Sequence, residues 1–172
     1  DKLLEMPPPS PADVPALRAL LALPAPRAAR ALLGTVLARR PPNSGTVIAS
    51  HEPEMQVEPA SLVKIMTAYL AFAAINEKRL DLEQKVNVST RAWKLDRDSS
   101  KMFIDPATPV TIKDLLYGLI VQSGNDASVA LGEAVAGTEE AFAAQMNRTA
   151  ERMGMTATRF ANSHGLPSPD NY

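Results

Sequence analysis

The longest apolar stretch of the chain follows Ser61 and predicts a helix. Nearly every residue from Ser61 to Asn76 is apolar, and the charged sequence NEKRL ends the run. An apolar run of about a dozen residues is typical of a helix in a protein core and is too short to cross a membrane. We therefore expect a buried helix over residues 61–76 at the centre of the domain, and no transmembrane span in this chain.

Cap and stop residues predict three more helices in the second half of the chain. The first begins at Thr111, a favoured N-cap residue, and is broken by the sequence SGND. The second follows this break and ends at Gly137, and the third, an amphipathic helix, is capped by Thr138 and stopped by Gly154. The first two of these helices therefore meet at the sequence Ser-Gly-Asn, residues 123–125.

Strands are predicted in two short regions only. The turn sequence NSG precedes TVIAS, a β-rich run at residues 46–50, and LDLEQKVNVS, residues 80–89, alternates apolar and polar residues like a small strand pair. The sequence after residue 157 has the character of a loop. Helices therefore dominate the predicted secondary structure.

The first 42 residues differ in composition from the rest. Nine of the fifteen prolines lie there, and no acidic residue occurs between Pro15 and His51, although arginine recurs in an Ala/Leu/Pro background. Such a segment lacks the periodicity that buries a face. We therefore assign residues 1–42 to an atypical Pro/Ala/Arg-rich arm that packs little, with a targeting or membrane-surface role as an alternative. Residues 43–172 form the predicted domain.

Composition excludes several classes of function. The formal net charge of −1 gives no electrostatic argument for binding nucleic acid, and the absence of cysteine rules out disulfides and thiolate chemistry. The two histidines, His51 and His164, lack the spacing of a zinc site. We therefore expect no nucleic-acid partner, no metal and no cofactor, and the length of 172 residues favours one domain.

Ser61 and Lys64 are the first candidates for chemistry. Residues three apart on a helix share one face, so the lysine amine can come within hydrogen-bonding distance of the serine hydroxyl. Burial among apolar neighbours favours the neutral amine, which could then act as the base that activates the serine as a nucleophile. The alternative is structural, because serine is a favoured helix cap and lysine is common on helices.

The Ser123-Gly124-Asn125 turn is the second candidate. Glycine lets the backbone of a tight turn approach a ligand, and the flanking hydroxyl and amide can point into a cleft. The alternative is again a cap, with Asn125 or Asp126 capping the helix that follows.

Both motifs occur, in this order, within a longer resemblance. The sequences PASLVKIMTAYLA, RLDLEQKVNVS, SSKMFIDPATPVTIKDLLYGLIVQSGNDASVALGEAVAG and NSHGL closely resemble the low-molecular-mass penicillin-binding proteins that are D-alanyl-D-alanine carboxypeptidases. The resemblance runs from about Asn43 to Tyr172. It implies an α/β (α+β) domain of the β-lactamase/transpeptidase-like serine DD-peptidase fold, truncated, with mainly its helical part present.

The resemblance also implies roles for individual residues. Ser61 matches the nucleophile, Lys64 the base, Ser123 a proton relay, and Asn125 the group that holds the substrate amide. The implied substrate is the peptidoglycan stem peptide, whose terminal D-alanine is removed through an acyl-enzyme, and β-lactams are implied to acylate the same serine. The sequence His-Gly-Leu, residues 164–166, matches a family loop near the cleft, with a surface-loop role as the alternative. The implied location is the periplasm, peripheral to the inner membrane.

The chain departs from the family in the segment upstream of the NSG turn and in the family's third motif. The family binds the substrate carboxylate with Lys-Thr-Gly on a strand, and no lysine of this chain is followed by threonine. We therefore expect the N-terminal part of a catalytic domain, with Lys64 solvated and charged for want of a covering sheet, and a weakly active or inactive enzyme. A serine β-lactamase and a non-catalytic helical fragment are the alternatives.

Overall fold

The computed structural model describes residues 55–95 and 99–172. The chain divides into two compact units, and the fold described below is that of the second, Glu58–Tyr172. The predictions for the N-terminal arm, for the strand at residues 46–50 and for His51 lie outside the described residues.

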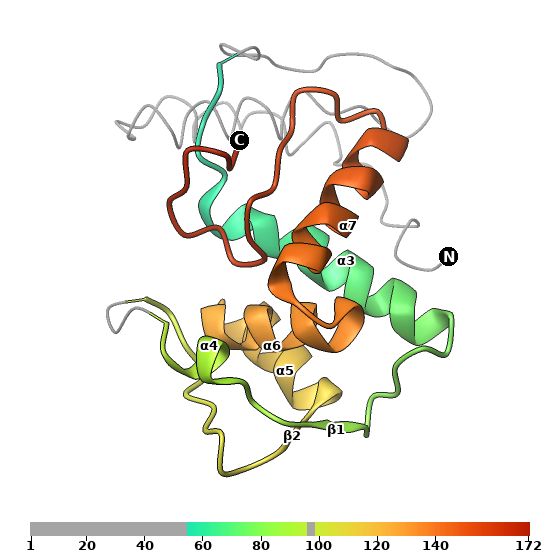
Figure 1. The fold of residues 1–172 in the computed structure, drawn as a ribbon, viewed down its shortest axis with the longest axis vertical. Coiled ribbons are helices and arrows are strands. Elements are labelled where there is room, and N and C mark those ends of the chain that lie inside the picture. The colour runs from blue at the N-terminus through green and yellow to red at the C-terminus, as the bar shows by residue number, and fades with distance from the viewer. Residues whose placement is uncertain (1–54, 96–98) are drawn as a thin grey trace, which may run out of the picture. The chain divides into compact units, whose positions relative to one another are not determined.

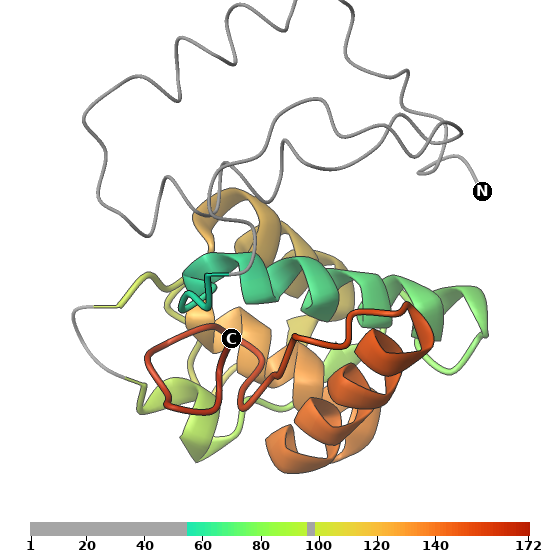
Figure 2. The ribbon, with the colours of Figure 1, turned by 90° about the horizontal axis from the view of Figure 1, so that it is seen from above.

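Helices joined by loops build this unit, together with one pair of very short strands (Figure 1). In both views the C-terminal loop, drawn in red, lies beside the start of α3 (Figure 2). The elements in chain order are the 3-10 turn η2 (Ala60–Leu62), α3 (Val63–Asn76), β1 (Lys85–Val86), α4 (Thr90–Trp93), β2 (Val110–Thr111), α5 (Ile112–Gln122), α6 (Asn125–Ala136) and α7 (Glu139–Arg152).

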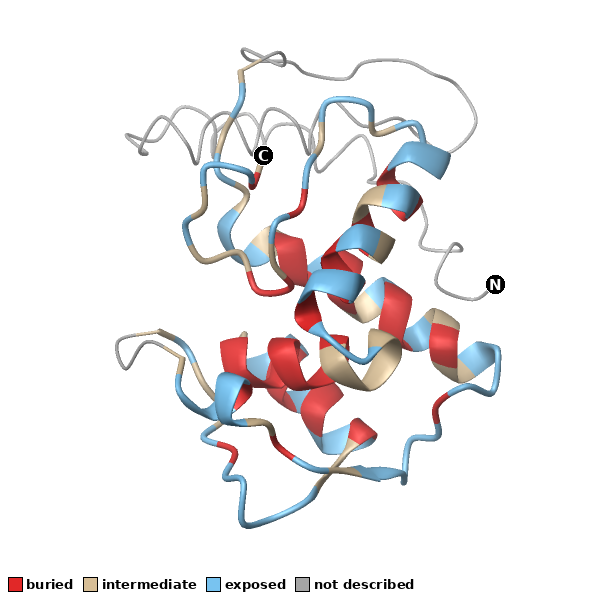
Figure 3. Cartoon of the chain, viewed as in Figure 1, coloured by how far each residue is buried: buried red, intermediate tan, exposed pale blue. Residues whose placement is uncertain are grey.

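Helix α6 is the centre of the unit and contacts α3, α4, α5 and α7. All of its residues from Asn125 to Gly132 are buried (Figure 3). Small side chains allow this close packing: a Cβ on Gly132 would lie 2.9 Å from Cδ1 of Phe142 on α7. The core forms two clusters, one around α5 and α6 and one between α3 and α7.

The helices confirm most of the sequence prediction. The Oγ1 of Thr111 accepts a hydrogen bond from the N–H of Asp114 at the start of α5, and Thr138 caps α7 in the same way with Ala141. Helix α6 ends at Gly137, where φ is +86°. These side-chain caps satisfy N–H groups that lack a partner within the helix, which is why the sequence marks these helix starts well.

Helix α3 is buried on one side only. Val63, Met66 and Leu70 lie in the core, whereas Ile65 is 68% and Tyr69 50% exposed. The prediction of a buried helix is therefore wrong for the stripe that carries Ile65 and Tyr69. An apolar sequence permits burial on every side of a helix. It does not show which sides are covered by other elements.

The strand pair predicted within residues 80–89 is also wrong. Only β1 forms there, and it pairs with the distant β2 in antiparallel register, Lys85 opposite Thr111 and Val86 opposite Val110. The second half of the predicted pair instead leads into α4, where the Oγ of Ser89 accepts from the N–H of Ala92. A local cap therefore competes successfully with a local hairpin.

A buried carboxylate holds the chain that precedes α5. Asp126, which is 1% exposed, accepts hydrogen bonds from the N–H of Met102 at 2.9 Å and from the N–H of Ile104 at 3.2 Å. Between these two donors, Phe103 has a φ of 62° and is 83% exposed. A positive φ is unfavourable for such a residue by about 1–2 kcal/mol, so the carboxylate stabilises a strained backbone.

Replacing this carboxylate should destabilise the fold. In Asp126→Asn the new N–H group meets a backbone donor, so the free energy of unfolding should fall by about 1–3 kcal/mol. Urea denaturation followed by circular dichroism measures this change. The control is Asp105→Asn, an exposed residue whose Oδ1 accepts from the N–H of Ala107 and whose replacement should cost less than about 0.5 kcal/mol. Equal losses in the two variants would contradict the role assigned to Asp126.

Candidate active site

The structure brings the two sequence motifs together at the starts of α3 and α6. Ser61 lies in η2, and its Oγ is 3.3 Å from the Nζ of Lys64 on the first turn of α3. The Oγ of Ser123 donates a hydrogen bond to the Oγ of Ser61 at 3.1 Å, across 62 residues of sequence. The serine hydroxyl therefore lies between an amine and a second hydroxyl, the arrangement that activation of a nucleophile needs.

Both serines lie at strained points of the backbone. Ser123 ends α5 in the left-handed conformation with φ 55°, and Ala60, directly before Ser61, has φ 46°. Each conformation costs about 1–2 kcal/mol for a residue other than glycine. Strain of this kind is concentrated at functional sites, where surrounding contacts hold it in place.

Lys64 is buried rather than solvated. The residue is 6% exposed, and burial lowers the pKa of its amine to about 8. The expectation that Lys64 is solvated is therefore wrong, although at this pKa most of the amines are still charged at pH 7. The Nζ donates a hydrogen bond to the backbone oxygen of His164 at 2.6 Å, and a neutral amine in this position keeps its lone pair for the Ser61 hydroxyl.

A close approach of two backbones makes the contact with Lys64 possible. Gly165 has a φ of +82°, and a Cβ on it would lie 1.8 Å from the backbone oxygen of Ala60. Only glycine fits this position. The side chain of Asn162 shapes the same turn, because its Oδ1 accepts from the N–H groups of His164 and Gly165.

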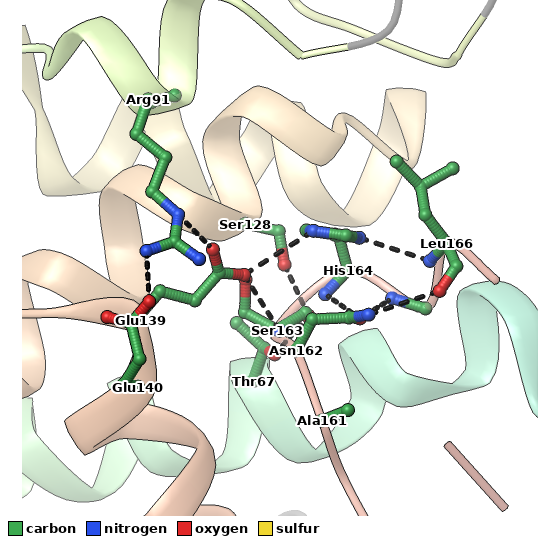
Figure 4. Close-up of polar contacts among 12 residues, drawn as sticks. Thr67, Arg91, Ser128, Glu139, Glu140, Ala161, Asn162, Ser163, His164 and Leu166 are labelled. Carbon is green, nitrogen blue, oxygen red and sulfur yellow. Dashed lines mark hydrogen bonds and ion pairs between the residues drawn. The ribbon is translucent and has the colours of Figure 1, made fainter. Parts of the chain in front are cut away.

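The ring of His164 is buried. Its Nδ1 accepts from the N–H of Leu166 at 3.1 Å, so the proton is assigned to Nε2, which faces Glu139 at 3.4 Å (Figure 4). Burial is the main cause that lowers the pKa of His164, against the raising effect of Glu139. The surface-loop alternative for residues 164–166 is therefore wrong for His164, which contacts the site through its backbone oxygen.

Asn125 is buried, at 5% exposed, and its backbone N–H donates to Ser100. Among the described residues its side-chain amide has no hydrogen-bond partner. The N-cap position of α6 is Gly124, without a side-chain cap, so the proposed capping roles of Asn125 and Asp126 are not what the structure shows. A buried amide without a partner is uncommon and suits the binding of a polar ligand group.

The sequence analysis did not identify the polar residues that connect the helices of the site to the C-terminal loop. Hydrogen bonds and an ion pair join α3, α4, α6 and α7 to the C-terminal loop (Figure 4). They are made by the side chains of Thr67, Arg91, Ser128, Glu139 and Ser163. Their signal in the sequence was weak, because Glu139 has the position of an ordinary first-turn acid, and Thr67 and Ser128 have those of ordinary helix residues.

In the part of the chain that the structure describes, no group of His, Asp and Glu side chains could hold a metal ion. None of the described helices has the length and apolar character of a membrane span.

Comparison with known proteins identifies the family. The profile of one family, described as D-alanyl-D-alanine carboxypeptidase, matches residues 40–172. The chain belongs to the D-alanyl-D-alanine carboxypeptidase family. It is 41% identical over 133 residues to the D-alanyl-D-alanine carboxypeptidase DacC of Escherichia coli, covering 75% of this chain and 33% of DacC.

Solved structures agree with this family assignment. Penicillin-binding protein 5 of Haemophilus influenzae matches 76% of this chain and 38% of its own chain, with a TM-score of 0.73 and 39% identity. Penicillin-binding protein D2 of Listeria monocytogenes, in its cefotaxime-bound form, matches 65% of this chain and 44% of its own with a TM-score of 0.56 and 27% identity. These matches confirm the DD-peptidase fold. The chain spans about a third of the length of the curated relatives it matches.

The lowered pKa of Lys64 should appear in the stability of this family member. The pKa of the amine is about 8 in the folded chain and 10.5 for the ordinary group, so between these pH values the unfolded chain binds more protons. The free energy of unfolding should therefore rise between pH 8 and pH 10.5, by up to about 3 kcal/mol. The comparison is with Lys64→Met, which has similar size and no titration; parallel pH curves would show that Lys64 is not perturbed.

Gly165 should be irreplaceable at its position. Gly154→Ala is the control, because Gly154 also has a positive φ, +74°, but has nothing within 4 Å of an added Cβ. The control should cost about 1–2 kcal/mol, from backbone strain alone. Gly165→Ala should cost clearly more and raise the pKa of Lys64, because the loop must move away from Ala60. Denaturation and NMR titration of the lysine amine measure both effects, and equal costs for the two variants would contradict the close approach.

Proposed function

We propose that this chain carries the nucleophile and base of a serine D-alanyl-D-alanine carboxypeptidase, with Ser61 as nucleophile and Lys64 as base. The observation that carries the proposal is the position of the Ser61 Oγ, 3.3 Å from the Lys64 Nζ and 3.1 Å from the Ser123 Oγ. The lowered pKa of Lys64 supports it, because about a tenth of the amines are then neutral at pH 7, far more than for an ordinary lysine.

The proposed reaction removes the terminal D-alanine of a peptidoglycan stem peptide. The Oγ of Ser61 attacks the carbonyl carbon between the two D-alanines while its proton passes to Lys64. The C–N bond then breaks, and the proton held by Lys64 passes to the leaving amine through the hydroxyl of Ser123, which bridges to Ser61. A water molecule then attacks the ester carbonyl and gives a proton to Lys64, and this proton passes to the Oγ of Ser61 as the ester C–O bond breaks.

Asn125 is proposed to bind the substrate rather than to react. Its buried side chain has an NH2 group that can donate to the C=O, and a carbonyl oxygen that can accept from the N–H, of a peptide bond in the stem peptide. The absence of a protein partner for this amide among the described residues supports the role. β-Lactams are proposed as ligands of the same site, in keeping with the cefotaxime-bound form of the Listeria protein. The substrate is a cell-wall peptide, so we propose a periplasmic location at the inner-membrane surface.

Acylation by penicillin tests the proposal. Mass spectrometry should find the mass of one penicillin added to the peptide that contains Ser61. We expect slow labelling, because no Lys-Thr-Gly sequence is available in this chain for the ligand carboxylate, and loss of a single oxyanion donor already costs about 10²–10³ in rate. Ser61→Ala should abolish the adduct, and Ser168→Ala, a serine of the C-terminal loop outside the site, should retain it.

The other outcomes separate the rival functions. Rapid turnover of penicillin without a stable adduct would favour a serine β-lactamase. Complete absence of an adduct after prolonged incubation, with the chain folded, would favour a non-catalytic helical fragment. An adduct on another residue would contradict the role of Ser61.

A further inference from the structure

The backbone oxygen of Ser163 is a shared acceptor for two helices. The Thr67 Oγ1 donates to it from α3 at 2.6 Å, and the Ser128 Oγ donates from α6 at 2.5 Å (Figure 4). All three residues are completely buried, with 0% exposure. In a buried site without competing water, such hydrogen bonds are strong and costly to break.

Each donor lies one turn beyond a residue of the site. Thr67 follows Lys64 by three positions on α3, and Ser128 follows Asn125 by three positions on α6. Residues three apart lie on the same face of a helix. The single oxygen of Ser163 therefore connects the face of α3 that carries the proposed base with the face of α6 that carries the proposed binding amide.

The C-terminal loop is itself held firmly behind this oxygen. The N–H and the Oγ of Ser163 both donate to Oε1 of Glu139, at 3.1 and 2.9 Å, and Oε2 of Glu139 pairs with Arg91 at 2.8 Å. Glu139 is 2% exposed, and its buried charge is compensated by the half-exposed Arg91 of α4. The next residue along the loop, His164, gives its backbone oxygen to the Nζ of Lys64.

We propose that the backbone oxygen of Ser163 sets the register between α3 and α6, and that Thr67 and Ser128 are positioning residues for Lys64 and Asn125. The inference rests on the proposed function, because it treats Lys64 and Asn125 as the base and the binding group. Both hydroxyls are fully buried and donate to the loop, so they act through the loop. Loss of either donor lets the loop and the two helices shift, and water then reaches the amine of Lys64.

Two neutral substitutions test the inference in the full 172-residue chain. Thr67→Val keeps the shape of the side chain and Ser128→Ala keeps most of it, and each removes one donor without changing charge. Thr149→Val is the matched control, a buried threonine of α7 whose Oγ1 accepts from Arg152. Circular dichroism and urea denaturation first establish that each variant folds.

The decisive measurement is the pKa of Lys64, followed by NMR of the lysine side chain and assigned by loss of the signal in Lys64→Arg. In both test variants this pKa should rise from about 8 toward 10.5, and in the control it should not move. The titratable and charged groups on the elements around this amine, which are Glu139, Arg91 and His164, are unchanged in every variant. A rise in the Lys64 pKa would therefore reflect a change in the solvation and position of its amine.

Penicillin acylation supplies a second readout. Where the parent chain forms the Ser61 adduct, each test variant should form it on the order of 100-fold more slowly, because a displacement of about 1 Å has that effect on a reacting pair. Failure of the parent chain to form the adduct would contradict the proposed function. The positioning role would still be tested by the Lys64 pKa, because that measurement does not require an active chain.

Three results would overturn the positioning role. The first is an unchanged Lys64 pKa in folded Thr67→Val or folded Ser128→Ala. The second is an equal rise in the Thr149→Val control. The third is loss of folding in both test variants while the control folds, which would show a purely structural role.

Discussion

The removal of the Lys64 amine from water is the constraint on which the rest of the site depends. A lysine next to a serine is ordinary, and it can serve as a base only where burial disfavours its charged form. In this chain the burial is achieved by a loop from the far end of the sequence, whose His164 oxygen accepts from the Nζ. The contact requires Gly165 against Ala60, because any larger residue would push the loop outward.

Two buried carboxylates at the starts of helices stabilise the surroundings of this amine. Asp126 accepts backbone N–H groups at the first turn of α6, and Glu139 accepts from the loop at the first turn of α7. The positive end of a helix favours a negative charge there, which lowers the cost of burying it. One carboxylate orders the segment around Phe103 and the other orders the segment around Ser163. The irregular segments beside the site are thus fixed by helix termini rather than by strands.

The sequence predicted the helices because their signals are local. Thr111, Thr138 and Gly137 mark helix ends through their own hydrogen bonds or backbone preferences, and the structure follows them. The sequence could not predict the pairing of β1 with β2. Lys85 and Thr111, which pair, are far apart in the sequence, and no local pattern indicates such a contact. Strand pairing is decided by tertiary context.

The candidate site shows the same division between local and distant information. Ser61 and Lys64 are close by helix geometry alone, and the Ser123 turn was recognised from its sequence. Glu139 and Ser163 were missed, since each is ordinary in its own segment and acquires a role only when α7 and the loop meet. Residues that touch reacting groups tend to form short motifs, whereas residues that hold them in place are chosen by contacts distant in sequence.

The exposed stripe on α3 bears on how the base is assembled. Ile65 and Tyr69 lie on the uncovered side of the helix, and Lys64 lies on the other, against α6 and the C-terminal loop. A helix presents residues one position apart to different sides, so covering or uncovering the stripe changes little around the amine. The contacts of the amine with Ser61 and with the backbone oxygen of His164 both lie within residues 58–172. The pairing of Ser61 with its proposed base is therefore a property of this helical unit, and it depends on the loop that closes over the start of α3.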